Sequence, residues 1–136
     1  TLLTAANDSK LQFVEHNIRG VKVIETPNLA PSTGYDPWDT LRRIWWLRDK
    51  QFDLIHAFES RPLVIVPALQ LQKRLNIPLV MDWCDWFGAG GSVEERTGWS
   101  KGLLRRTETY FEEGFRTHAQ GTTVINTILR NKALAL

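Results

Sequence analysis

The sequence lacks several features that mark common functional classes. It has one cysteine among 136 residues, so no disulfide can form within the chain and a cysteine-rich zinc site is excluded. No apolar run approaches the ~20 residues that span a bilayer. The net charge is only +2, and basic and acidic residues are interspersed in segments such as RRTETYFEEGFR, so nucleic acid is a poor fit as a partner. The single cysteine fits a reducing compartment, and we expect a cytoplasmic location.

What is present is typical of a folded domain. Hydrophobic residues make up 43% of the chain and charged residues 24%, which is ordinary for a globular protein. The length is sufficient for one domain with its own core. No internal repeat or linker divides it, so we treat residues 1–136 as a single domain.

Short apolar runs alternate with amphipathic segments along the chain. We expect strands at residues 1–5, 52–58, 77–83 and 122–126, and one within residues 18–27 that is bounded by Gly20 and Pro27. We expect helices at residues 7–17, 36–50, 61–76, 101–120 and from 127 onward. Several strands are continuous apolar runs, which is typical of a parallel sheet covered on both faces. The pattern therefore predicts an α/β fold, with a Rossmann-like parallel sheet and helices on both faces.

Local signals support two of these helices. Asp8 or Ser9 can cap the helix at residues 7–17, which would place Leu11 and Val14 on one face. Asp36 can cap the helix at residues 36–50, where the following proline suits the first turn.

Polar side chains stand where two of the predicted strands end. His56 and Glu59 follow one strand, and Asp82 and Asp85 follow the next along the chain. In a parallel sheet of this type, ligands bind beyond the carboxyl ends of the strands. The sequence therefore predicts a binding site at that edge.

Each of these residues also has a structural interpretation, which the sequence leaves open. Asp85 can cap a turn, Asp82 can form a salt bridge and His56 can be a core histidine. Glu59 can cap the helix that begins near Pro62. The lone cysteine between the aspartates, Cys84, is expected to be a small buried residue rather than a reactive thiol.

The segment FGAGGSVEERTGWS follows this strand end. Its GAGG run at residues 88–91 does not match the dinucleotide pattern GxGxxG, because Val93 stands where the last glycine is needed. We expect a mobile loop instead, which could close over a bound substrate as a lid.

The helix LRRIWWLRDK carries two adjacent tryptophans, Trp45 and Trp46. Both cannot point into one core stripe, so one is expected to be partly exposed. Tryptophan beside arginine suits a membrane interface. The alternative is an ordinary surface helix whose arginine stems cover apolar area, or a face that packs against further chain.

Four segments, in this order, resemble the N-terminal domain of a GT-B glycosyltransferase of the large retaining family 4 (group 1) type. They are GVKVIETP, FDLIHAF, NIPLVMDWCDWFG and HAQGTTVINTILR. Where many family members carry a histidine before the aspartate, this chain has Cys84, and Asp85 is the residue that matches. The family's first strand with its glycine-rich loop and its C-terminal domain with paired glutamates have no counterpart in these residues.

The resemblance implies a fragment of a larger two-domain enzyme, with the first strand missing. The intact enzyme would transfer a sugar from a nucleotide-sugar donor to an acceptor with retention, and this acceptor-side domain would be inactive alone. No cofactor or obligatory metal is implied, and the donor would be held mainly by the missing C-terminal domain. Asp85 would be the catalytic residue. The implied acceptor-binding residues are His56, Glu59, Asp82, Gly88, Gly90 and Gly91.

The resemblance allows a sugar or a lipid-linked molecule as the acceptor. It also allows a peripheral contact with the inner membrane face and a homodimer. The alternative function is a noncatalytic α/β binding or interaction module. A hydrolase is disfavoured because the chain has no G-x-S-x-G nucleophile elbow.

Overall fold

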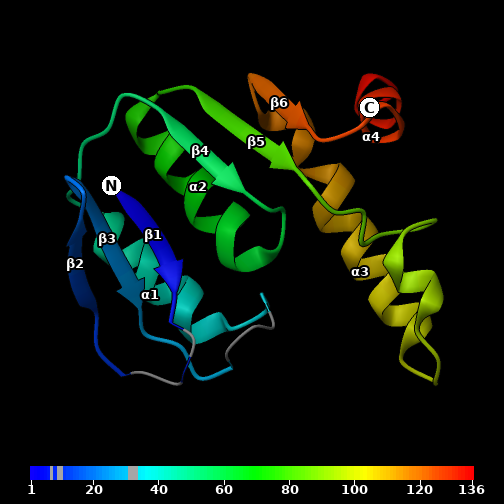
Figure 1. The fold of residues 1–136 in the computed structure, drawn as a ribbon, viewed down its shortest axis with the longest axis horizontal. Helices are drawn as coiled ribbons and strands as arrows, with labels where there is room; N and C mark the ends of the chain where they lie inside the picture. The colour runs from blue at the N-terminus through cyan, green and yellow to red at the C-terminus, as the bar shows by residue number, and fades with distance from the viewer. Residues whose placement is uncertain (7, 9–10, 31–33) are drawn as a thin grey trace.

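A computed structural model of the protein describes residues 1–6, 8, 11–30 and 34–136. The strands are β1 (Leu2–Ala5), β2 (Val14–Ile18), β3 (Val21–Thr26), β4 (Ile55–Phe58), β5 (Leu79–Trp83) and β6 (Gly121–Val124). The helices are α1 (Pro37–Leu47), α2 (Pro62–Leu75), α3 (Lys101–Gly114) and α4 (Thr127–Leu134), with short 3₁₀ turns at Ser92–Glu95 and Arg116–His118. Figure 1 shows strands and helices alternating along most of the chain, which confirms the α/β class.

The strands form two small sheets. One has the order β4-β5-β6, and all three strands run parallel. The other has the order β1-β3-β2, in which β1 and β3 are parallel and β2 is antiparallel to β3. The predicted parallel sheet is therefore present over β4, β5 and β6, while the N-terminal sheet is mixed.

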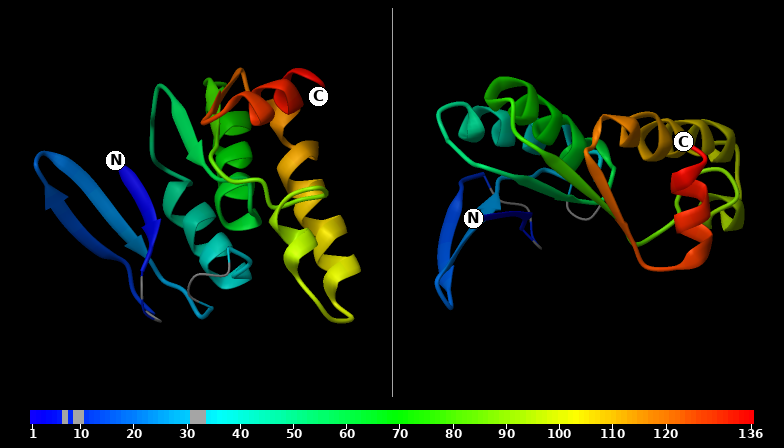
Figure 2. Two further views of the ribbon diagram at one scale, coloured as in Figure 1. Left: turned by 45° about the vertical axis from the view of Figure 1, so that its right-hand side comes forward. Right: turned by 90° about the horizontal axis from the view of Figure 1, so that it is seen from above.

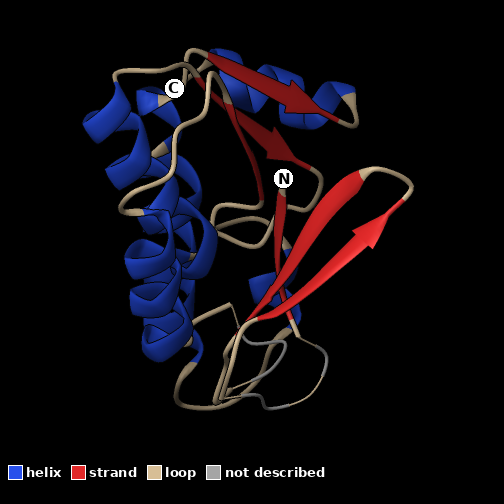
Figure 3. Cartoon of the chain, turned by 90° about the vertical axis from the view of Figure 1, so that its left-hand side faces the viewer, coloured by secondary structure: helices blue, strands red, loops and turns tan. Residues whose placement is uncertain are grey.

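The helix predicted at residues 7–17 is wrong. Residues 14–18 form β2, which turns back into β3 through Arg19 and Gly20. These two turn residues have φ angles of 51° and 83°, and a two-residue hairpin of this kind needs positive φ at both positions. Figure 3 shows the hairpin standing apart from the helices, which is why its exposed strand carries no clear alternation of apolar residues. The cap predicted at Ser9 lies outside the described residues.

The helices α1, α2 and α3 cover one face of the strands (Figure 2). The core on that face is formed by Ala57, Ile65, Ala68, Leu79 and Met81. Aromatic residues of α3 and its C-terminal end pack against the same cluster.

The expectation of helices on both faces is met on one face only. Along β5, buried and partly exposed residues alternate, so the apolar run VMDW is buried from one side. His56 and Phe58 of β4 are exposed on the opposite face, Phe58 to 56%. Helix α4 packs beside β6 at the end of the sheet rather than over β4.

Helix α1 begins as predicted at Asp36. The Asp36 carboxylate accepts hydrogen bonds from the backbone N–H groups of Trp38 at 2.9 Å and Asp39 at 3.2 Å. It also accepts bonds from the N–H groups of Leu29 and Ala30 in the preceding loop. Burial alone would raise the pKa of Asp36, but these four bonds hold it below its ordinary value.

The buried face of α1 contains an ion pair. Arg43 Nε lies 3.0 Å from Asp39 Oδ1 one turn earlier, and it also donates to Thr26 Oγ1 of β3. Leu47 continues this face, while Trp45 is half exposed at 50%. The expectation that one of the two tryptophans is exposed is therefore confirmed. Among the described residues, no helix is long and apolar enough to cross a membrane.

Candidate functional site

The carboxyl ends of β4 and β5 place several of the predicted polar residues at one edge of the sheet. Glu59 comes directly after β4 and has a φ of 90°, a backbone conformation that residues with a side chain rarely adopt. Its carboxylate oxygen Oε1 lies 3.1 Å from Arg61 Nη1. Such strain costs about 1–3 kcal/mol and is typical of functional sites.

The pKa of Glu59 is raised by its surroundings. Burial raises its pKa above the ordinary value, the Arg61 guanidinium opposes that shift, and the nearby charges of Glu108 and Asp85 raise it further. Glu59 and Asp85 are therefore close enough for their charges to interact, although they follow different strands. The alternative in which Glu59 caps α2 is wrong, because the N-cap residue is Arg61 and no side chain caps that helix.

Asp85 is exposed at the end of the segment that leaves β5. An ionised carboxylate there can only accept hydrogen bonds, so it is suited to holding a substrate hydroxyl. Glu59 lines a cavity that opens beside this edge.

Asp82, at the end of β5, has partners within the protein. Its two carboxylate oxygens accept hydrogen bonds from the Cys84 thiol and the Thr123 hydroxyl of β6. These two bonds lower the pKa of Asp82. The bond with Asp82 in turn raises the pKa of the Cys84 thiol. The expectation that Cys84 is buried is wrong, because its side chain is exposed. The raised pKa keeps the thiol protonated and poorly nucleophilic.

His56 is not a core histidine. It is exposed on the open face of β4, where its ring stacks on Phe58 with centroids 4.2 Å apart. The charge of Asp82 on the neighbouring strand interacts with it, since β4 and β5 pair in parallel. His56 and Asp82 therefore lie together on the open face, and Glu59 and Asp85 lie beyond the strand ends.

Behind Glu59 lies a buried glutamate that the sequence reading missed. Glu108 of α3 is 3% exposed, and its two oxygens lie 3.9 Å from Arg61 Nε and from Arg96 Nη2. The Tyr35 hydroxyl also interacts with Glu108, and its pKa is raised mainly by burial and then by this carboxylate. Arg61 stacks on the ring of Phe87 at 4.2 Å, which fixes its position between the two acids.

The glycine-containing loop after β5 is packed against α3. Glu112, which is 1% exposed, accepts hydrogen bonds from Trp83 Nε1 at 2.9 Å, Phe87 N at 2.9 Å and Gly88 N at 2.7 Å. A side chain at Gly88 would collide with Glu112 and with the α3 backbone at Thr109. Glu112 therefore holds the start of this loop in place.

The next two glycines fit around Trp86. A Cβ atom at Gly90 would lie 2.7 Å from the Trp86 ring, and one at Gly91 would lie 2.1 Å from the Trp86 carbonyl oxygen. These contacts explain Gly88, Gly90 and Gly91 by close packing. A role of the three glycines in binding an acceptor stays a prediction.

The four-residue spacing of Glu108 and Glu112 was the sequence signal that could have indicated these two buried acids. Glu108 and Glu112 of α3 and Arg116 of the following 3₁₀ turn recur at intervals of four residues, which is the spacing of one helix face. In the sequence they look like a solvated charged face, but all three are buried. Burial lowers the pKa of Arg116 to about 10, although the nearby acids Glu112 and Asp82 oppose the shift, and its guanidinium stacks on Trp83 at 4.1 Å.

Over the described ranges, no group of three or more histidine, cysteine, aspartate or glutamate side chains is arranged to hold a metal ion. The site is thus an edge of carboxylates backed by two arginines, open to solvent at Asp85. It can accept hydrogen bonds from a polyhydroxylated ligand.

Comparisons of the chain with protein-family models, with curated proteins and with solved structures find no match in any of the three.

Proposed function

We propose that this chain is the acceptor-side domain of a two-domain glycosyltransferase of the GT-B type, with a Rossmann-like sheet that the full-length protein completes. The proposal is supported by the order of the sequence segments described above and by the parallel α/β layer. In this function the intact enzyme transfers a sugar from a nucleotide-sugar donor to an acceptor hydroxyl. The donor is bound mainly by a second domain outside these residues.

The observation that carries the proposal is the strained Glu59 beside Asp85 at the carboxyl ends of β4 and β5. Ligands of parallel α/β sheets bind at this edge. In the proposed role Asp85 accepts a hydrogen bond from the acceptor hydroxyl and orients it toward the donor sugar. Glu59, held by Arg61, forms the neighbouring wall of the acceptor site.

The test is release of nucleotide from a panel of nucleotide sugars, measured for the full-length protein and for the isolated 136-residue chain. The proposal predicts acceptor-dependent release by the full-length protein and none by the isolated chain, which lacks the donor-binding half. Turnover by the isolated chain, or no turnover by the full-length protein with any donor and acceptor, would contradict it.

The outer surface of α1 supports a lipid-linked acceptor within this proposal. Trp38 and Trp45 are 40% and 50% exposed, and Leu41 between them is 61% exposed. The Arg42 guanidinium stands over both tryptophan rings, and Arg48 stands 4.7 Å from the ring centre of Trp45. Exposed tryptophans with adjoining arginines suit the headgroup region of an anionic membrane.

Trp45→Ser tests this surface by sedimentation with vesicles of phosphatidylglycerol and phosphatidylcholine. Removing one exposed aromatic ring that would insert into the membrane should weaken vesicle binding about tenfold. Trp99→Ser is the matched control, because Trp99 is 95% exposed on a loop far from α1 in the sequence. Equal binding by the Trp45 variant and the unsubstituted protein would exclude α1 as a membrane contact.

A further inference from the structure

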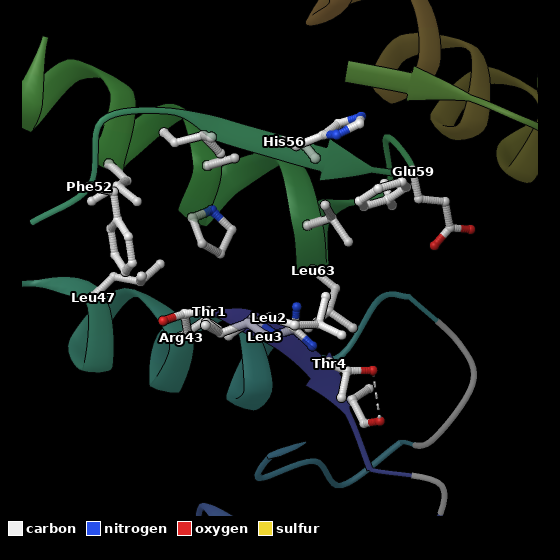
Figure 4. A pocket seen from close by; sticks show the side chains of 18 of the residues that line it. Thr1, Leu2, Leu3, Thr4, Arg43, Leu47, Phe52, His56, Glu59 and Leu63 are labelled. Atoms are coloured by element: carbon white, nitrogen blue, oxygen red, sulfur yellow. Dashed lines mark hydrogen bonds between the residues drawn. The ribbon is translucent and has the colours of Figure 1, made fainter. Parts of the chain in front are cut away.

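The mixed N-terminal sheet has two edge strands with different surroundings. The outer edge of β1 borders a cavity of about 460 Å³, which Figure 4 shows between Leu2 and Leu3 of β1 and residues of β4 and α2. The outer edge of β2 is not enclosed in this way. Over the described residues β2 pairs only with β3, and Figure 3 shows the hairpin of β2 and β3 standing apart from the helices. An open edge of this kind can pair with another strand.

The two-residue turn between β2 and β3 fixes which backbone groups of β2 face outward. In a hairpin of this kind the residues that flank the turn, here Ile18 and Val21, exchange both of their backbone hydrogen bonds. Successive residues of a strand direct their N–H and C=O groups to opposite edges. The even-numbered residues of β2 therefore face β3, and the outward-facing residues within β2 are Glu15 and Asn17.

The sequence of β2, VEHNI, is complementary to itself when two copies run antiparallel. With His16 of one copy opposite His16 of the other, Glu15 of each copy lies opposite Asn17 of the other. Both residues have outward-facing backbone groups, so each such pair can exchange both of its backbone hydrogen bonds. The side-chain oxygen of Asn17 already accepts a bond from the Gly20 N–H at 3.0 Å, so its NH₂ group can donate to the opposite Glu15 carboxylate.

The opposite face of the paired strands is apolar near the hairpin tips. In the same register Val14 of one copy lies opposite Ile18 of the other, and Val21 of β3 lies beside Ile18 within each copy. The side chains of Ile18 and Val21 are 56% and 49% exposed in the single chain. Pairing covers part of this apolar surface, which favours association.

Other antiparallel registers of two β2 strands are less favourable. A shift that brings Glu15 opposite Glu15 places like charges against each other. A shift in the other direction brings Glu15 opposite Arg19, whose φ of 51° lies in the turn and does not continue a strand. Edges that resist pairing usually carry a proline, a lysine or a bulge. The strand β2 has neither residue, and its pairing with β3 is continuous.

We propose that β2 pairs antiparallel with β2 of a second copy of this chain, about a two-fold axis between their His16 residues, so that the two N-terminal sheets form one continuous sheet. Both copies use the same strand, which is the arrangement of a symmetric dimer. The interface is short, so its dissociation constant is on the order of 100 µM. The proposal does not rest on sugar transfer, and it leaves Glu59 and Asp85 outside the interface.

The first test is amide hydrogen exchange of the 136-residue chain, resolved by residue, at about 10 µM and about 1 mM protein. The Glu15 and Asn17 amides should exchange about fourfold more slowly at the higher concentration, because the second copy then accepts their hydrogen bonds. The His16 and Ile18 amides face β3 within one copy, so their exchange should depend less on concentration.

The second test compares two variants of one position by sedimentation equilibrium. Asn17→Glu places a carboxylate opposite Glu15 of the other copy, and Asn17→Lys places an ammonium group there. The glutamate variant should raise the dissociation constant about tenfold and the lysine variant should lower it about tenfold, since each acts at both symmetric pairs. Both variants lose the turn bond from the Gly20 N–H, so they are matched in that respect.

The folding stability of the two variants should change in the opposite order. Within one copy, Asn17 lies opposite Lys22 of β3, which also pairs with Glu15 at 2.7 Å. At about 10 µM protein, the melting temperature of Asn17→Glu should therefore be higher than that of Asn17→Lys, because opposite charges across a hairpin stabilise it and like charges do not. A folding defect alone would weaken folding and association in the same variant.

Three results would overturn the proposal. The first is a chain that remains monomeric at about 1 mM. The second is a dimer with the same dissociation constant in both Asn17 variants, which means that another surface associates. The third is exchange of the Glu15 and Asn17 amides that does not depend on concentration, which means that no second copy covers the edge of β2.

Discussion

Each of two neighbouring strand ends in one sheet has a glutamate beside it, and the two glutamates differ in their hydrogen-bond and ion-pair partners. At the end of β5, Glu112 of α3 accepts three hydrogen bonds, from Trp83 Nε1 and from the backbone N–H groups of Phe87 and Gly88. At the end of β4, Glu59 sits in a strained backbone conformation with one arginine partner and a raised pKa. The first arrangement stabilises the fold, and the second costs stability.

The difference shows how a structural acid is told apart from a functional one. A buried carboxylate whose oxygens are all bonded to fixed donors needs no ligand to explain it. A partly buried carboxylate on strained backbone persists only because the surrounding structure holds it there, and such residues cluster at binding sites. This criterion favours Glu59 as part of the proposed binding edge where β4 and β5 end, and it favours a structural role for Glu112, which holds the glycine loop after β5.

The largest expected effect is on the β5 side. Glu112→Ala leaves two backbone N–H groups and the Trp83 indole N–H without their acceptor, and it removes one of the two acids near Arg116. The free energy of unfolding, measured by urea denaturation, should fall by about 3–5 kcal/mol.

Glu113→Ala is the matched control, because Glu113 is the next residue, has the same charge and pairs with Lys132 at a partly exposed site. Its effect should stay within about 1 kcal/mol. Similar effects of the two substitutions would remove the distinction between the two strand ends.

Gly91→Ala has the next largest expected effect. The added methyl group would meet the Trp86 carbonyl oxygen at 2.1 Å, and a backbone atom cannot move aside cheaply. We expect a loss of about 1–3 kcal/mol in thermal or urea unfolding. Gly102→Ala, in α3 with open space around it, should instead gain up to about 1 kcal/mol. A neutral Gly91→Ala would mean that the loop is free to move, as a lid would be.

Glu59→Gly should act in the opposite direction on the β4 side. Glycine adopts a φ of 90° without strain, so the free energy of unfolding should rise by about 1 kcal/mol. Under the proposed function, the same substitution should reduce turnover of the full-length protein, because it removes one wall of the proposed acceptor site. A loss of stability would show that Glu59 has a structural role like that of Glu112.

Glu59→Gln separates strain from charge in that experiment. It keeps the strained backbone but removes the titration. Because the folded protein raises the pKa of Glu59, ionisation opposes folding, and stability should fall as pH rises from about the ordinary glutamate value of 4.5. The glutamine variant should lose this part of the pH dependence. If stability depends on pH in the same way in the glutamine variant and the unsubstituted protein, the pKa of Glu59 is not shifted by its surroundings.

The sequence predicted the features that depend on local chemistry. The cap of α1 at Asp36, the apolar strands β4 and β5, and the exposure of one tryptophan of the pair Trp45 and Trp46 were all readable from short patterns. The hairpin at Arg19 and Gly20 was not, because an arginine in a left-handed conformation carries no sequence signal of its own.

The candidate site was predicted in part, for a physical reason. Residues that directly follow strands are easy to find, so Glu59 and Asp85 were named from the sequence. Glu108 and Glu112 were missed because a buried glutamate on a helix has the same spacing as an exposed one. Only the tertiary contacts with Arg61 and with the backbone of the loop after β5 show that these two acids lie in the interior.

The central claim is that the functional edge of this sheet lies where β4 and β5 end, and Asp85→Asn tests it most directly. Turnover and the melting temperature of the full-length protein are measured together for the variant and the unsubstituted protein. Asp85 is exposed, so the melting temperature should change by no more than about 2 °C. Turnover should fall by about 100-fold or more, because the amide cannot hold the acceptor hydroxyl as the carboxylate does. Equal turnover in the two proteins would contradict the account.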